Sequence, residues 1–94
     1  MTLEARGLDT TPQTVEKLRA ANDEPTAAIL DVIFRDEIKH LAVGVRWFEH
    51  LCPTPHTAYK ALIDERFPCG LKPPFNMEAR AQAGMGAEYL RWWL

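Results

Sequence analysis

The feature that most constrains this chain is a long run of periodic apolar residues between Thr26 and Leu51. An α-helix turns by about 100° per residue, so it collects these residues on one side. The residues within roughly 80° of Glu37 are Leu30, Ile33, Phe34, His40, Leu41, Gly44, Trp47, Phe48 and Leu51. The opposite side carries Asp31, Arg35, Lys39, Arg46 and Glu49. The run therefore predicts one amphipathic helix with a carboxylate and an imidazole in the middle of its apolar stripe.

Glu37 and His40 are the two polar residues in this stripe. An ionised carboxylate that is buried without a partner costs several kcal/mol. A divalent metal ion removes that cost, and Glu at i with His at i+3 can reach one ion from a single helix face. The simpler alternative is a solvated Glu and a hydrogen-bonded His, which is what most Glu-x-x-His pairs are. The apolar setting favours Glu37 and His40 as metal ligands.

The length and composition limit the remaining choices. The chain has 94 residues, 47% hydrophobic and 26% charged, which predicts one small globular domain. The net charge is −2 and the basic residues are dispersed among the acids, so no nucleic-acid partner is expected. Neither a membrane span nor a signal peptide is recognisable, so we expect a cytoplasmic protein with no membrane partner. Cys52 and Cys69 are expected to be free thiols.

The rest of the chain contains several shorter helix signals. Residues 1–9 look like the last turns of a helix that stops at Gly7, and a second helix is predicted from Thr10 to about Ala21. After the long helix we expect a helix over 55–67 that buries one side. The buried side is predicted to consist of Tyr59, Leu62, Ile63 and Phe67.

The C-terminal residues are rich in helix breakers. Residues 68–74 predict a loop, Asn76 predicts the cap of a short helix, and a last short helix is predicted over 87–94. No segment alternates with a period of two, so the fold class is all-α.

Four blocks of this sequence are more specific than generic helix sequence. They are LEARGLD at 3–9, Thr11-Pro12, RDEIKH at 35–40 with Gly44 and Arg46–Phe48, and LKPPFN at 71–76 with Glu78–Arg80. In order and spacing they resemble the ferritin-like family of unknown function 455, over nearly the whole chain. The resemblance implies a four-helix bundle with a dinuclear iron or manganese site, to which each half gives one Glu and one Glu-x-x-His.

Only the second half of this pattern has a match here. The resemblance assigns Glu4 as the single carboxylate and Glu37 with His40 as the Glu-x-x-His. It gives Asp36 a supporting role, in which its carboxylate holds the metal-binding His of the other half. The chain then forms a partial ferritin-like domain: 1–52 as the second half of the bundle and 53–94 as a C-terminal helical extension. Three ligands leave the dinuclear site incomplete, which indicates a fragment of a longer protein or a homo-oligomer.

Two functions of different classes follow. The first is a metal-binding protein that becomes an O2-dependent oxidoreductase when the site is complete, with this chain inactive alone. The alternative is a non-enzymatic helical module that binds itself or a partner through Trp47, Phe48, Trp92 and Trp93. A weaker metal grouping, His50 with Cys52 and His56, is interrupted by prolines.

Overall fold

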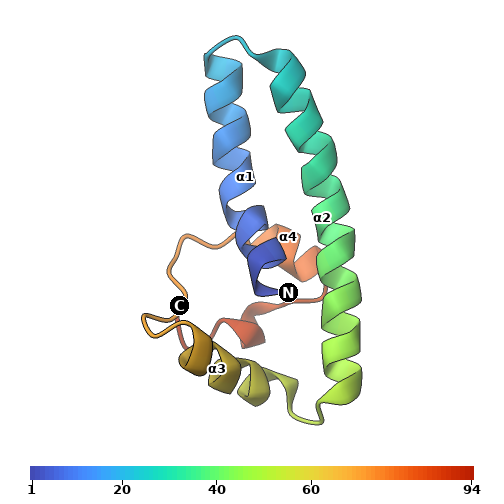
Figure 1. Ribbon diagram of the computed structural model, residues 1–94, viewed down its shortest axis with the longest axis vertical. Helices are drawn as coiled ribbons and strands as arrows, with labels where there is room; N and C mark the ends of the chain where they lie inside the picture. Colours follow the sequence, from blue (N-terminus) through green and yellow to red (C-terminus); the bar gives the residue numbers. More distant parts are fainter.

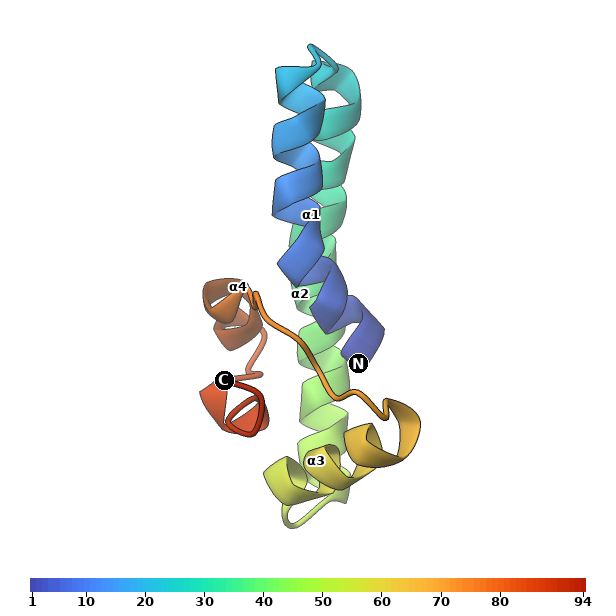
Figure 2. The same ribbon diagram turned by 90° about the vertical axis from the view of Figure 1, so that its left-hand side faces the viewer.

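The computed structural model describes all 94 residues, and every regular element in it is helical. Helices α1 (Thr2–Ala20) and α2 (Glu24–Leu51) form a long antiparallel hairpin (Figure 1). Helix α3 (Pro55–Arg66) crosses the base of the hairpin. The chain then returns along α1 to α4 (Met77–Gln82) and a 3-10 turn at Ala87–Tyr89 (Figure 2). The predicted all-α class is confirmed, whereas the four-helix bundle stays a prediction because one chain supplies two long helices.

Helix α1 is continuous, so the predicted stop at Gly7 and the predicted new start at Thr10 are both wrong. Pro12 lies inside the helix and has no N–H to donate to the carbonyl of Leu8, which normally breaks or kinks a helix. The side-chain amide of Asn76 donates to this carbonyl instead, at 3.0 Å. The helix therefore passes through Pro12 because a residue far along the chain replaces the missing hydrogen bond.

Helix α2 contains the whole run predicted between Thr26 and Leu51 and begins two residues earlier, at Glu24. The carboxylate of Asp23 caps it by accepting a hydrogen bond from the backbone N–H of Thr26 at 3.3 Å, and Pro25 occupies the first turn. Helix α1 packs along α2, and the buried residues of α2 are Ala27, Leu41 and Val45.

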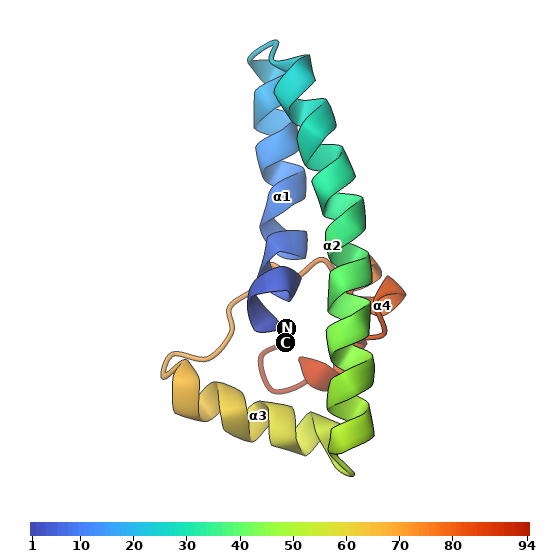
Figure 3. The ribbon, with the colours of Figure 1, turned by 45° about the vertical axis from the view of Figure 1, so that its right-hand side comes forward.

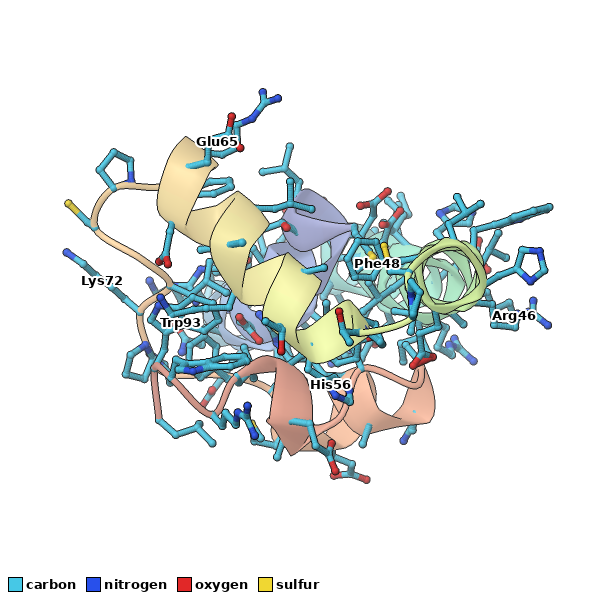
Figure 4. All side chains as sticks on the ribbon, turned by 90° about the horizontal axis from the view of Figure 1, so that it is seen from below. Arg46, Phe48, His56, Glu65, Lys72 and Trp93 are labelled. Atoms are coloured by element: carbon cyan, nitrogen blue, oxygen red, sulfur yellow. The ribbon has the colours of Figure 1, made fainter.

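Only one flank of the predicted apolar stripe is covered. Phe34 and Phe48 pack against the core, and Figure 4 shows Phe48 pointing into the molecule while Arg46 points away. On the other flank Trp47 is 62% exposed, and the side chain of His40 is 64% exposed. The prediction that His40 is buried is therefore wrong for a single chain, because α1 is the neighbour on one flank and nothing covers the other.

Helix α3 and the C-terminal segment lie side by side at the base of the hairpin (Figure 3), and both supply residues to the core. Tyr59 and Ile63 are buried as predicted, whereas Leu62 and Phe67 are exposed. The helix predicted over 87–94 is wrong, since only Ala87–Tyr89 forms a helical turn. Beyond that turn Trp93 packs edge-on against Tyr59, with ring centroids 6.4 Å apart, so tertiary packing sets the course of this segment.

Two further facts concern the chain as a whole. Both cysteines are free thiols. No helix combines the length and the apolar character needed to cross a membrane.

Candidate metal centre

Glu37 and His40 lie one turn apart on α2 and point the same way. The imidazole Nδ1 of His40 and Oε1 of Glu37 are 3.0 Å apart. The Glu37 side chain is 31% exposed, since it lies between the covered and the open flanks of α2. One carboxylate and one imidazole therefore converge as a shared metal ion requires, and the same contact also satisfies the simpler alternative of a hydrogen-bonded pair.

Glu4 lies on α1, near the turn of α2 that carries His40. Its carboxylate forms a salt bridge of 2.7 Å with the amino group of Met1. The hydrogen bond from this ammonium, a backbone hydrogen bond and the charge of His40 together hold the pKa of Glu4 below its ordinary value. A Cβ on Gly44 would lie 3.4 Å from Cγ of Met1, so the N-cap residue of α1 packs against α2 one turn beyond His40.

These predicted ligands do not form a complete metal site within one chain. No three His, Cys, Asp or Glu side chains are close enough together to hold an ion. The structure brings Glu37 and His40 together, and Glu4 contacts the amino terminus instead. Asp36 is exposed on the side of α2 that also carries His40. Carboxylates and imidazole are donor types that suit iron or manganese.

The weaker grouping of His50, Cys52 and His56 is not assembled either. His50 lies edge-on to Trp47, with ring centroids 6.0 Å apart on α2. His56 is half-buried and packs edge-on against Tyr89 of the C-terminal segment, with ring centroids 4.6 Å apart. The two imidazoles therefore serve different parts of the structure.

A buried ion pair that the sequence pattern did not single out joins two of the four specific blocks. Arg80 of α4 donates to both carboxylate oxygens of Asp9 on α1, through Nε at 2.9 Å and Nη2 at 2.6 Å. The backbone N–H of Asn76 donates to the same carboxylate at 2.7 Å. Arg6 bridges the same blocks, since it donates to Asp9 at 3.1 Å and to the carbonyl of Lys72 at 2.7 Å. The blocks at 3–9 and 71–80 are therefore two sides of one contact.

This contact is almost completely removed from solvent, with Asp9 and Arg80 side chains 1% and 2% exposed. Burial raises the pKa of Asp9, but the hydrogen bonds from Arg80 and Asn76 outweigh it, so the pKa lies below its ordinary value. The face of Phe75 covers the Arg80 guanidinium at 5.0 Å. A signal was present in the sequence, because Asp9 and Arg80 each occupy a block too specific for an ordinary solvated helix.

The fold and these contacts define an all-helical protein built on an antiparallel hairpin that its C-terminal segment locks through a buried ion pair. The chain belongs to the family described as "Protein of unknown function (DUF455)", which matches residues 1–91. It is 36% identical over 94 residues to an uncharacterised protein of Haemophilus influenzae. That match covers 96% of this chain and 33% of the relative, so the chain spans about a third of the relative's length. No solved structure matches the chain.

Proposed function

We propose that this chain supplies one half of a carboxylate-rich metal centre in a ferritin-like helical bundle. The observation that carries the proposal is the convergence of Glu37 and His40 at the middle of the apolar stripe of α2, with 3.0 Å between Oε1 and Nδ1. The side chain of His40 is 64% exposed and that of Glu37 is 31% exposed, so both groups remain accessible to donors from outside this chain. Glu4, on the adjacent helix, is the third donor.

Completion of the centre requires donors from outside this chain. A dinuclear carboxylate site in a helical bundle takes about two Glu and two Glu-x-x-His motifs, and the chain has one of each. The missing donors belong either to the remainder of a longer protein, as in the relative three times this length, or to a second copy. Iron or manganese bound there would supply redox chemistry, so the O2-dependent oxidation belongs to the complete centre.

Metal-dependent stabilisation tests this proposal. Chelator-treated protein is titrated with Mn(II), or with Fe(II) in the absence of oxygen, and its unfolding transition is measured. A ligand at about 100 times its Kd stabilises the folded state by about 2.7 kcal/mol, and Glu37→Gln and His40→Gln should abolish this shift. His50→Gln is the matched control, because His50 lies on the same helix and is exposed. The absence of a shift in wild-type protein that forms a dimer, or an equal shift in all variants, would overturn the proposal.

The second function is non-enzymatic self-association, which the open flank of α2 favours. Large apolar side chains are exposed along it, among them Ile29, Val43 and Trp47. Large apolar side chains exposed together on one face of a small protein often mark a protein contact. This function needs no metal, so association that persists in chelator separates it from the first.

A further inference from the structure

One line of exposed residues on α2 has the spacing of a helix–helix seam. Successive members are separated alternately by four and three residues, the heptad pattern that keeps side chains on a seam between two helices. They are Ile29, Ile33, Asp36, His40, Val43 and Trp47, all classed as exposed. We refer to these six residues as the open seam.

No other element of the chain covers the open seam. Helix α4 approaches α2 at Val45, where Cγ1 lies 3.8 Å from a Cβ built on Gly84. Val45 and Trp47 are two residues apart, so their side chains project about 160° apart around the helix. Helix α4 therefore packs on nearly the opposite side of α2, and the open seam is free to receive a second helix.

The open seam is complementary to itself when its direction is reversed. A two-fold axis beside Ile38 would place each residue next to the one equally far on the other side of Ile38. Asp36 then meets His40, Ile33 meets Val43, and Ile29 meets Trp47. A parallel pair would instead place Asp36 beside Asp36 and His40 beside His40. The sequence of the open seam thus favours an antiparallel pair of identical helices over a parallel one.

We infer that the open seam is a homodimer interface in which two copies pair antiparallel along α2. Asp36 of each copy contacts the partner's His40 and fixes the register, and Trp47 packs against the partner's Ile29 as the apolar anchor. The two hairpins then bring four long helices together. Glu37 lies between the flank that faces α1 and the open seam, so its carboxylate faces the interior of this assembly.

This inference rests on the self-association hypothesis above and does not depend on a bound metal. All measurements are therefore made in chelator. The first is the mass of the wild-type protein in solution by sedimentation at high micromolar concentration, where a dimer is expected. Asp36→Lys should raise the dimer dissociation constant by at least about tenfold, and His40→Asp added to it should restore most of the affinity.

Directed cross-linking then tests the register in a background with Cys52→Ser and Cys69→Ser. Ile33→Cys and Val43→Cys are made as separate single variants and oxidised alone and as a mixture. The antiparallel register predicts a disulfide-linked dimer chiefly in the mixture, whereas a parallel register predicts it in each variant alone. Arg35→Cys is the control, because Arg35 is exposed on the far side of α2. All these substitutions of seam residues change exposed positions, so the fold should persist.

The outcomes distinguish self-association in general from pairing through the open seam. A monomer in sedimentation would overturn both self-association and the open seam. A dimer whose mixture gives no more cross-link than the Arg35→Cys control would overturn the open seam while leaving self-association intact. The metal titration is independent of both results. A dimer that cross-links chiefly in the mixture supports the inference.

Discussion

Replacing Asp9 by Asn should destabilise the protein more than most single changes on its surface or in its loops. The carboxylate accepts two hydrogen bonds from Arg80, one from the backbone of Asn76 and one from Arg6. Asp9→Asn removes the negative charge and leaves the guanidinium of Arg80, which is 2% exposed, without a counter-ion. The contact that joins α1 to α4 would then contain an uncompensated buried charge.

The expected magnitude follows from that burial. Removal of one partner from a buried ion pair costs about 3–5 kcal/mol, against a total stability of about 5–15 kcal/mol for a small domain. Asp64→Asn is the matched control, because Asp64 pairs with Lys60 at the surface of α3 and is 55% exposed. An exposed pair contributes about 0–1 kcal/mol, so this control should unfold nearly as the wild type does.

The measurement is equilibrium urea unfolding followed by helix circular dichroism. With a dependence of about 1–3 kcal/mol per molar urea, Asp9→Asn should lower the midpoint by at least about 1 M. The double change Asp9→Leu with Arg80→Met should lose less stability than Asp9→Asn, since it leaves no buried charge. Equal midpoints for Asp9→Asn and Asp64→Asn would refute the argument that this pair locks the C-terminal segment onto α1.

Three further predictions concern pH and packing. The pKa of Asp9 is lowered in the folded state, so its contribution to stability is complete above the ordinary Asp pKa of about 3.9 and is lost as the pH falls below it. When the free energy of unfolding is measured at decreasing pH, it should fall less steeply in Asp9→Asn than in the wild type. Equal slopes would contradict this. Leu41→Ala removes a fully buried side chain and should lower the free energy of unfolding by about 2–5 kcal/mol in the same urea assay. Leu3→Ala, at a position 79% exposed, should change it by no more than about 0.5 kcal/mol. Gly7→Ala should stabilise the protein by about 0.5–1 kcal/mol, because no atom lies within 4 Å of the added Cβ; a destabilised variant would show that Gly7 has a packing role.

The helices with local signals were predictable from the sequence. The bounds of α2 follow from the cap at Asp23 and the prolines after Leu51, and α4 follows from Asn76, whose side chain accepts from the N–H of Ala79. The relative direction of Glu37 and His40 was also predictable, because helix periodicity alone sets it. These features depend on residues that are close together in the chain.

The features that sequence patterns missed depend on distant residues. Helix α1 continues through Pro12 because Asn76 satisfies the carbonyl of Leu8, and no local pattern contains that information. The Asp9–Arg80 pair likewise joins residues that are far apart in the sequence. The apolar stripe on α2 was predicted only in part. Its members Ile33, Trp47 and Leu51 are exposed, whereas Ala27 and Val45, outside the predicted stripe, are buried. A pattern shows which residues need a neighbour and not whether one chain supplies it.

The claim that Glu37 and His40 are metal ligands is tested most directly by the metal content of the purified protein. The protein would be loaded with Fe(II) or Mn(II) under nitrogen, desalted, and analysed for metal per chain beside Glu37→Gln, His40→Gln and the His50→Gln control. The proposal predicts about one metal ion per chain in the wild type and the control, and a loss of most of it in the other two variants. Wild-type protein that retains no metal while it forms a dimer, or metal retained equally by all four proteins, would contradict it.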